Sequence, residues 1–599
     1  MYFPSSLFLR CFSLGLLLLS ALHTKAQLQA SSTSTPVTCY QASDGSIDLQ
    51  VSGGASPYTY SWNNGATTED LNNLSGGIYS VTVRDAFGAL VVHTDTVAAP
   101  NGPLSVTTST SSVDTSNQTG TLNMSVTGGV VPYSYTLNGG AVQSIASQPV
   151  LWDQGQFGPS GWWQFNALAT DGQGNIYGTG YIWDTVVIDG QTVPRVDPSK
   201  NGTDLLFAKF DAQYNLLWYK TAGTTNSAFS SSSNDVSVDN QGNAYVVGSF
   251  RDTLYWDTLT LVAQGTSDGF LAKYSPAGDL LWVQTVAGKS DDVVNAIETD
   301  DLGNSYITGT FRDSTTLGGD KLYSVGFRDI FVAKFDPTGN KVWGFSGGTT
   351  SFDDSRTLCF DPNGDLILAP RMPGSGSIQG NAFSFSASRH ILVKVSANGS
   401  VQWMEPFSPS TSISLSLNDL ATDPAGNIYA TGSFGSTLVI GNSTFVNAGP
   451  QDFFLAKFSP TGTGLWANIG YTNTTSGLSN VGNEVLVDGS GAIYVAGQAY
   501  TGQNIFPSVP QDFTFTSTGQ NDAFVVKYNT DGNIIWLKHA MGGGNTDGEG
   551  LAIDANGIHL GGGFAGTMTL DGTNYTSSSY SGFLARIDQS QESNLPNLG

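Results

Sequence analysis

Short runs of apolar residues, separated by turns rich in Gly, Asn, Asp and Pro, follow one another along the chain from residue 34 to residue 588. Some runs alternate apolar with polar positions and others are continuously apolar. Both kinds are short, which predicts β-strands and not helices. From residue 150 onward the runs recur with three fixed markers, and such self-similarity indicates a repeat architecture. The pattern therefore predicts an all-β protein made mostly of one repeated unit.

The first marker is an aspartate with a glycine three residues later. Asp at the first position of a type I turn and Gly at the fourth favour a tight hairpin turn. Each turn joins a short strand to an aromatic strand, such as AYVVGSF at 244–250. The pairs are Asp171/Gly174, Asp239/Gly242, Asp300/Gly303, Asp361/Gly364, Asp423/Gly426, Asp488/Gly491 and Asp554/Gly557.

The second marker is an apolar strand with one basic residue, and the third is a tryptophan nine residues after each lysine. The constant offset predicts a second hairpin, in which the basic strand turns into the tryptophan strand. The basic residues are Lys209, Lys273, Lys334, Lys394, Lys457, Lys527 and Arg586. The tryptophans are Trp218, Trp282, Trp343, Trp403, Trp466 and Trp536.

Each unit thus holds four strands, and the repetition predicts a seven-bladed β-propeller over residues 147–588. An open β-solenoid is the alternative. The last unit has no tryptophan after Arg586, whereas Trp152 stands alone before the first unit. We therefore expect the strand at 149–152 to act as the seventh tryptophan strand and to close the ring, which removes an exposed sheet edge.

Residues 1–26 have the pattern of a secretory signal peptide. Arg10 precedes the apolar run FSLGLLLLSAL, and small residues around Ala26 predict cleavage before Gln27. No later stretch reaches the ~18 apolar residues of a membrane-spanning helix. We therefore expect an exported protein that is not integral to a membrane and that is located outside the cell, on its surface or in the periplasm.

Residues 34–98 hold short alternating runs with Gly, Pro and Asn turns, which predicts a small Ig-like β-sandwich. The string from Cys39 through PYTYSW (57–62) and LSGGIY (74–79) resembles the SprB-type repeat of Bacteroidetes surface proteins. The segment LNMSVTGG (122–129) repeats part of it, so 103–146 is interpreted as a degenerate second repeat or a linker. The resemblance implies a spacer or an adhesive stalk on a surface protein.

The larger repeated unit resembles the SBBP, or beta-propeller repeat, family of secreted bacterial proteins. The matching motifs are GNAY at 242–245 followed by Gly248, and DIFVAKF at 329–335. Asp365 and Ala492 depart from the first motif, where the family has asparagine. The resemblance implies a propeller with a role in adhesion or gliding. The family's C-terminal sorting domain is not visible in the polar tail 589–599, so the route to the surface is left open.

Charge and cysteine content narrow the classes of partner. The chain has 23 Lys and Arg against 48 Asp and Glu, a net charge of −25. So acidic a chain repels phosphate backbones, and nucleic acid is not expected as a partner. Loss of Arg10 and Lys25 with the signal peptide leaves −27, which argues against acidic ligands without a metal. Cys39 and Cys359 lie in different modules and are expected to be free thiols, in a monomer.

Each repeated marker has a structural and a functional interpretation. The turn aspartates would suit Ca²⁺, but each loop offers one or two acids against the ~6–8 oxygens that this ion takes. Capping of the turn is preferred, so no metal or other cofactor is expected. The lysines would form an anion-binding ring, but a lysine in an apolar strand more often pairs with an acid. The tryptophans would stack on sugars, but one fixed repeat position favours the core between blades.

Four tryptophans break the repeat and are better ligand candidates, because they fall in connections: Trp162, Trp163, Trp183 and Trp256. Small hairpins at 185–193, 437–446 and 568–576 lie between aromatic and basic strands. Equivalent connections of a propeller emerge on one face, so we expect these hairpins to form a rim around the axial mouth. Trp183 and Trp256 on this rim are the candidate residues for binding an extracellular glycan or a surface protein.

Catalysis has little support in the sequence. The histidines of the mature chain lie in different units, and no nucleophile elbow, metalloprotease helix or phosphate loop occurs. The acidic pairs Asp291/Asp292 and Asp353/Asp354 begin equivalent strands, which favours a structural role. The sequence therefore favours a non-catalytic binding or adhesion protein, with no catalytic or metal-binding residue assigned. The alternatives are a structural envelope protein and a carbohydrate-processing enzyme, which acids with shifted pKa at the axial mouth would favour.

Overall fold

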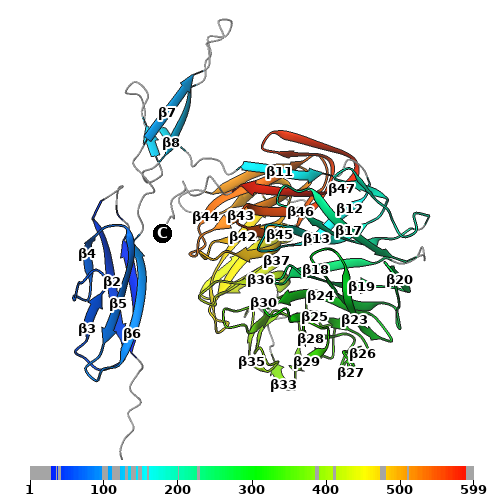
Figure 1. Ribbon diagram of the computed structural model, residues 1–599, viewed down its shortest axis with the longest axis horizontal. Helices are drawn as coiled ribbons and strands as arrows, with labels where there is room; N and C mark the ends of the chain where they lie inside the picture. Colours follow the sequence, from blue (N-terminus) through cyan, green and yellow to red (C-terminus); the bar gives the residue numbers. More distant parts are fainter. Residues whose placement is uncertain are drawn as a thin grey trace, which may run out of the picture. The chain divides into compact units, whose positions relative to one another are not determined.

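All regular elements that the computed structural model describes are β-strands (Figure 1). The described residues are 28–35, 37, 42–97, 105–110, 122–127, 133–135, 143–145, 151–157, 161–199, 201–224, 230–384, 390–408, 413–472, 480–508 and 512–588. In these ranges no helix is long and apolar enough to cross a membrane. The predicted signal peptide, Cys39 and the polar tail 589–599 lie outside them. The chain divides into two compact units, residues 1–148 with 594–596 and residues 149–593 with 597–599.

Two three-stranded antiparallel sheets form the start of the first unit. One has the order β1 (Gln29–Thr35), β2 (Gly45–Ser52), β4 (Leu71–Leu74), and the other β3 (Thr59–Trp62), β5 (Gly77–Arg84), β6 (Leu90–Val97). Alternate residues of the strands, such as Ile47, Leu49 and Val81, are buried with Trp62 in a common core. The period-two pattern of the sequence therefore places one face of each sheet inward.

The segment between this module and the second unit also forms strands. β7 (Ser105–Thr110) pairs with β8 (Leu122–Thr127), and β9 (Tyr133–Tyr135) pairs with β10 (Gln143–Ile145), both antiparallel. Residues 103–146 thus contain two short ladders. Their interpretation as a degenerate repeat or a linker stays a prediction.

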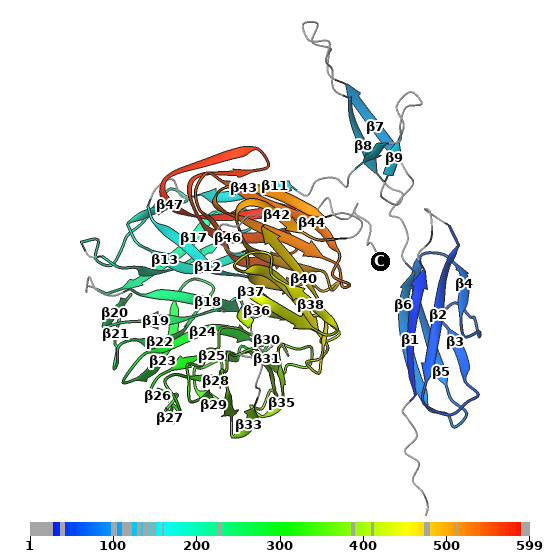
Figure 2. The ribbon, with the colours of Figure 1, turned by 180° about the vertical axis from the view of Figure 1, so that it is seen from behind.

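The second unit consists of four-stranded antiparallel sheets that follow one another around a ring (Figures 1 and 2). We call each sheet a blade and name it by its innermost strand. The β12 blade has the order β12 (Trp163–Thr170), β13 (Ile176–Ile182), β16 (Asp204–Phe210), β17 (Leu216–Gly223). This arrangement of twisted sheets around an axis is that of a β-propeller.

The other blades have the same antiparallel order from inside to outside, with bounds as follows. They are β18 (Ser232–Val238), β19 (Ala244–Phe250), β22 (Asp268–Tyr274), β23 (Leu280–Gly288); β24 (Asp292–Thr299), β25 (Ser305–Phe311), β28 (Asp329–Phe335), β29 (Lys341–Thr349); β30 (Leu358–Phe360), β31 (Leu366–Leu368), β34 (Ile391–Val395), β35 (Val401–Pro406); β36 (Ile413–Thr422), β37 (Ile428–Ile440), β39 (Asp452–Phe458), β40 (Gly464–Thr472); β41 (Val481–Val487), β42 (Ile493–Phe506), β43 (Phe513–Tyr528), β44 (Ile534–Gly542); and β45 (Thr546–Asp554), β46 (Gly557–Leu570), β47 (Thr573–Asp588), β11 (Leu151–Phe157).

The ring closes through the pairing of the unit's two ends. β11 pairs antiparallel with β47, from Leu151 opposite Asp588 to Phe157 opposite Phe583. The outermost strand of the β45 blade is therefore the strand that precedes the β12 blade in the sequence, as expected. The strand runs from 151 to 157, whereas the sequence predicted 149–152.

The register of the closing strand corrects one detail of the prediction. In the β12 blade Trp218 lies opposite Lys209, but in the closing pair Gln154 lies opposite Arg586, and Trp152 lies opposite Ile587. Trp152 therefore occupies the position before the bulge, which Leu216 holds in the β12 blade. The closing strand belongs to the pattern, but its tryptophan is not the seventh member of the set.

The inserted hairpins lie against outer strands, which corrects the predicted rim. β20 (Thr253–Trp256) and β21 (Leu259–Val262) connect β19 to β22, yet β20 pairs with β17 of the preceding blade. Such pairing covers part of an outer strand that would otherwise present free backbone groups. The hairpins that pair in this way link neighbouring blades at the periphery. The remaining short strands are β14 (Val186–Ile188), β15 (Gln191–Val193), β26 (Ser314–Leu317), β27 (Asp320–Tyr323), β32 (Ser375–Ile378), β33 (Asn381–Ser384) and β38 (Ser443–Val446).

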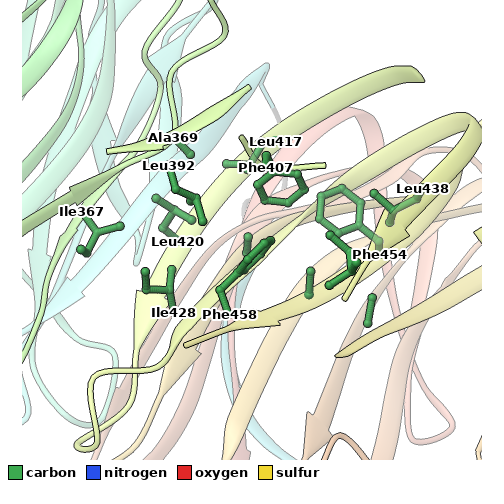
Figure 3. Close-up of a cluster of buried hydrophobic side chains, with 14 of the residues drawn as sticks. Ile367, Ala369, Leu392, Phe407, Leu417, Leu420, Ile428, Leu438, Phe454 and Phe458 are labelled. Atoms are coloured by element: carbon green, nitrogen blue, oxygen red, sulfur yellow. The ribbon is translucent and has the colours of Figure 1, made fainter. Parts of the chain in front are cut away.

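The apolar core lies between adjacent blades. In one cluster, Ile367 and Leu392 of the β30 blade are buried together with Leu420, Ile428 and Phe458 of the β36 blade (Figure 3). Burial of one such side chain stabilises a fold by ~1.5–3 kcal/mol. The stability of the propeller thus comes from apolar contacts between adjacent blades. The inner strands line the axis of the ring.

Candidate functional site at the central channel

The repeated Asp, Tyr and Lys residues form a structural group in each of several blades. Asp171 Oδ1 accepts the backbone N–H groups of Gln173 (3.0 Å) and Asn175 (2.9 Å), which caps the turn. Its Oδ2 lies 3.7 Å from Lys209 Nζ, and this ammonium lies 4.7 Å from the centre of the Tyr177 ring. The same ion pair joins Asp239 to Lys273, Asp300 to Lys334, Asp361 to Lys394 and Asp423 to Lys457.

These contacts account for the first two markers without a ligand. Each carboxylate is engaged by its own turn and by a lysine, so neither a calcium loop nor an anion-binding ring of lysines is needed to explain them. In the part of the chain that the structure describes, no group of three or more His, Cys, Asp or Glu side chains is placed to hold a metal ion.

The repeated tryptophans lie between blades. Trp218 Nε1 donates a hydrogen bond to the carbonyl oxygen of Pro276 (3.2 Å) in the next blade. The indole also covers Gly278, whose φ is +88° and where a Cβ atom would come within 3.0 Å of the ring. Trp282 covers Gly339 and Trp343 covers Gly399 in the same way. A glycine is therefore required in these turns, both for the backbone angle and for the approach of the indole.

A central channel of about 770 Å³ runs between the innermost strands of all the described blades. Asn166 Nδ2 bonds to the carbonyl oxygen of Ser233, and the hydroxyl of Ser237 bonds to that of Thr299. Neighbouring inner strands therefore have their starts side by side and their ends side by side. The starts of the inner strands define one end of the channel, which we call the upper mouth.

A bulge in most inner strands places an extra asparagine on the channel wall. Asn234 Nδ2 donates to the Val294 carbonyl oxygen (2.8 Å) in the next blade, and Asn295 Nδ2 donates to that of Ser355 (2.8 Å). A bulge leaves one residue outside the ladder, so its side chain is free to bridge strands. The sequence signal is an asparagine five residues before the turn aspartate, which was not recognised as a fourth marker. The residues are Asn166, Asn234, Asn295, Asn418 and Asn483, with Arg356 and Glu549 at the equivalent positions of two blades.

Acidic side chains also line the channel, at half-buried positions that the channel reaches. Asp235 Oδ2 accepts the backbone N–H of Ile297 (2.8 Å), and Asp419 Oδ2 accepts that of Val485 (2.9 Å). These carboxylates therefore satisfy the free edge of the next inner strand. Burial raises the pKa of Asp235 to about 7 and that of Asp419 to about 6.

Glu298 is the channel acid whose pKa rises furthest among those with a stated value. Burial is the largest cause of this rise, and the negative charges of Asp235 and Asp419 add to it. Together they raise the pKa of Glu298 to about 8. The channel thus gathers acids with raised pKa, which is the feature that favours the enzymatic alternative.

An aromatic pair with one exposed and one half-buried ring lies at the upper mouth, beside the start of β12. The rings of Trp162 and Trp183 lie 5.5 Å apart with an angle of 31° between their planes. The backbone N–H of Trp183 donates a hydrogen bond to the backbone carbonyl oxygen of Trp162 (2.7 Å). Trp162 is 44% exposed, and Trp183 is half-buried. Tyr580 adds a third ring, 6.0 Å from Trp162.

The other two candidate tryptophans are buried. Trp256 is 0% exposed, and its ring packs 4.9 Å from that of Phe270 because its hairpin is folded onto the preceding blade. Trp163 is 1% exposed and lies against Phe165. Trp256 is therefore removed from the candidate binding surface, while Trp183 remains and gains Trp162 as its neighbour.

A polar network continues from the aromatic pair into the channel. The Tyr580 hydroxyl lies 2.9 Å from Gln164 Oε1 and 2.5 Å from Asp547 Oδ2. Asn521 Nδ2 donates to the other oxygen of Asp547. Farther in, Gln498 Nε2 donates to Glu549 Oε1 (2.7 Å). These residues come from three blades, so the fold alone brings them together.

These features define the class of protein: a β-propeller that has a polar channel and an indole pair at the mouth of that channel. Residues 31–67 and 115–142 match the SprB repeat family. The resemblance to SprB repeats is thereby confirmed for the N-terminal region. The SBBP type and an origin in Bacteroidetes stay predictions.

Two curated proteins are similar to this chain. A WD repeat-containing protein of Acanthamoeba polyphaga mimivirus, itself uncharacterized, is 24% identical over 451 residues, which cover 62% of this chain and 32% of that protein. The regulatory protein FlaEY of Caulobacter vibrioides is 25% identical over 180 residues, which cover 28% of this chain and 18% of FlaEY. The match thus spans about a third of the first relative and less than a fifth of the second.

Solved structures are similar at low identity. A calcium-binding regucalcin from Agrobacterium tumefaciens is 14% identical, with 55% of this chain and 81% of that one covered and a TM-score of 0.27. A protein of unknown function from Dyadobacter fermentans is 12% identical, with 61% and 97% covered and a TM-score of 0.31.

Proposed function

We propose that this chain is a non-catalytic, exported or cell-surface binding protein, whose seven-bladed propeller binds a glycan at the upper mouth of its channel. The Ig-like module with its SprB-type repeat would serve as a spacer or adhesive stalk. The match to SprB repeats supports a surface-associated role. The observation that carries the glycan assignment is the exposed pair Trp162–Trp183.

Sugar rings have an apolar face of C–H groups and an edge of hydroxyls. The two indoles offer a large apolar surface to the face, and they lie beside amide and carboxylate groups that exchange hydrogen bonds with hydroxyls. Gln164 and Asp547, which meet at Tyr580, are the nearest such groups. An exposed aromatic pair of this kind also counts against a purely structural envelope protein, which has no use for it.

The test is a glycan array on the full chain, followed by calorimetry with the best neutral oligosaccharide. Trp162→Ala combined with Trp183→Ala should weaken binding at least tenfold and change the melting temperature little, because both rings lie at the surface. Tyr323→Ala is the matched control, since this aromatic is 66% exposed on an outer hairpin. Equal binding by the double variant and the control would refute the site.

The acids of the channel favour a second candidate, a carbohydrate-processing enzyme. A carboxyl whose pKa is about 8, as for Glu298, is protonated at neutral pH and is suited to donate a proton. Against this, Asp235 and Asp419 are held by backbone bonds of the adjacent strand. The test is incubation with a panel of polysaccharides. Release of reducing ends that Glu298→Gln abolishes would establish the enzyme. Polysaccharides that stay intact after long incubation would support the non-catalytic binding protein.

A further inference from the structure

Three arginines gather at the upper mouth, on blades other than those that carry the indole pair. Arg328 precedes β28, Arg356 precedes β30 and Arg371 follows β31. Arg356 lines the central channel and also two adjoining pockets. The first pocket, of about 360 Å³, has Arg328 on its wall, and the second, of about 190 Å³, has Arg371.

The carboxylate of Asp354 is shared by two of these arginines. It lies 2.8 Å from Arg356 Nε and 3.9 Å from Arg328 Nη2. The neighbouring Asp353 is occupied elsewhere, since its carboxylate accepts the backbone N–H (2.6 Å) and the hydroxyl (2.8 Å) of Thr349. Two guanidinium groups thus share one carboxylate, and Arg371 lines the adjoining pocket with no carboxylate besides that of Asp354 among the described residues of its wall. This leaves a local excess of positive charge in a chain of net charge −25.

The arginine cluster is held in place but remains open to solvent. Asp354 and Arg371 exchange backbone hydrogen bonds in both directions, at 3.1 and 2.7 Å. The side chain of Arg356 is 59% exposed and that of Arg328 is 36% exposed. His390 beneath the second pocket adds no charge at neutral pH, because burial lowers its pKa to about 4. A ligand that enters therefore meets preorganised guanidinium groups.

We propose that Arg328, Arg356 and Arg371 bind the carboxylate of an acidic saccharide, a uronate unit within a glycan chain. The inference rests on the proposed function and narrows its ligand class. Guanidinium groups bind carboxylates in a planar, two-pronged geometry. Arg356 and Arg328 already share one oxygen of the Asp354 carboxylate, so a carboxylate fits beside both guanidinium groups.

The saccharide is favoured over an acidic peptide by what surrounds the charge. The first pocket is also lined by Asn234, Asn295 and Thr310, whose amide and hydroxyl groups suit the hydroxyls of a sugar ring. Its volume is within the ~300–1,000 Å³ range of small-ligand sites. Because the pocket adjoins the same channel as the indole pair, one glycan chain would meet aromatic and cationic subsites on one face. The overall negative charge, which argued against acidic ligands, is locally reversed here.

The test compares uronate oligosaccharides (galacturonate, mannuronate and hyaluronate) with their methyl esters, which keep the sugar and remove the charge. Calorimetry on the full chain should show at least tenfold tighter binding of an acid than of its ester, and weaker binding as salt is raised. Arg356→Gln with Arg371→Gln should abolish that preference, and Arg356→Lys should weaken it, since lysine keeps the charge but not the planar fork. Arg251→Gln, an exposed arginine beside a peripheral hairpin, is the control for charge alone.

Each of the following results would overturn the proposal. They are equal affinity for acids and esters, an acid preference that survives in the double variant, and arginine-dependent binding of poly-glutamate in place of any saccharide. A sulfated oligosaccharide that binds more tightly than the uronates would likewise exclude the carboxylate. The two proposals fail separately: Trp162→Ala with Trp183→Ala tests binding of neutral glycans, whereas the arginine variants test the difference between acid and ester.

Discussion

The hydroxyl of Tyr214 lies 2.7 Å from Nδ1 of His559, and this hydrogen bond joins the β12 and β45 blades where the ring closes. Tyr214 occupies the turn position that is Gly278 in the next blade, and its φ is +63°. His559 lies opposite Arg586, where Tyr177 lies opposite Lys209 in the β12 blade. In four of the other blades a tryptophan packs edge to face on the tyrosine of its own blade, as Trp218 packs on Tyr177. At the closure the ring that packs on His559 comes from the following blade instead.

Replacing Tyr214 with phenylalanine tests this substitute contact. His559 is fully buried, so loss of the hydroxyl leaves a ring nitrogen without that partner, and we expect the free energy of unfolding to fall by ~1–3 kcal/mol. Urea denaturation measures it. Tyr219→Phe is the control, because its hydroxyl bond to the Thr192 carbonyl is exposed to solvent. Equal stability of the two variants would contradict the role of Tyr214.

Truncation tests the closing strand. Deletion of residues 27–146 removes strands of the first unit and should leave the urea midpoint of the second unchanged. Deletion of 27–157 also removes β11, which exposes the edge of β47 and takes away the half-buried indole of Trp152, so we expect a loss of at least ~3 kcal/mol. Identical midpoints for the two truncations would mean that the ring does not need β11.

Trp256 and its neighbour Tyr255 separate buried from exposed aromatics on one strand. Trp256→Ala should cost ~3–5 kcal/mol, because a fully buried indole is lost from the interblade core. Tyr255 is 41% exposed, and Tyr255→Ala should change stability by less than ~1 kcal/mol. Thermal and urea denaturation of both variants give the comparison. A loss of less than ~1 kcal/mol for Trp256→Ala would contradict the burial of Trp256 in the core between blades.

The channel acids predict a pH dependence of stability. Their folded pKa values, about 7 for Asp235 and about 8 for Glu298, lie above the unfolded values of ~4, so the folded state binds more protons between pH 4 and pH 8. Stability from these groups is present at low pH and is lost as pH rises through that window. The melting temperature should therefore be higher at pH 5 than at pH 8, and Glu298→Gln should reduce the difference. Below pH 4 carboxyls with lowered pKa, such as Asp300, act in the opposite direction.

The thiol of Cys359 is predicted to be unreactive in the folded protein. It is free, 6% exposed and packed in a hydrophobic cluster. Burial, followed by the negative charges of Glu298 and Asp419, raises its pKa well above the ordinary value, so little thiolate is present at neutral pH. Iodoacetamide followed by peptide mass spectrometry should find Cys359 unlabelled in native protein and labelled in urea. Rapid labelling of the native protein would show that the inner strand β30 opens.

The repeated scaffold was predictable from sequence because its markers are local. Asp171 and Gly174 specify a turn within four residues, and Lys209 and Trp218 specify a hairpin within ten. The same reasoning found β11, although the register that places Gln154 opposite Arg586 depends on a bulge that the sequence does not mark.

The functional surface was harder to predict because it is assembled from several blades and not from one repeated unit. Trp183 and Trp256 look alike in sequence, since both follow an aromatic strand. Burial of Trp256 arises from the pairing of its hairpin with the preceding blade. Likewise, Arg328 and Arg371 are far apart along the chain, and it is the ring that brings them to one mouth.

The strand pair that closes the ring also determines how the propeller would bear a mechanical load. Leu151 and Asp588 lie opposite each other at one end of the β11–β47 ladder. A pulling force applied between these two residues opens the ladder one bond after another, as a zipper opens, and does not load all its bonds together. We therefore expect single-molecule extension between residues 151 and 588 to detach β11 at low force, before any blade unfolds, so that tension would turn the closed ring into an open array of blades.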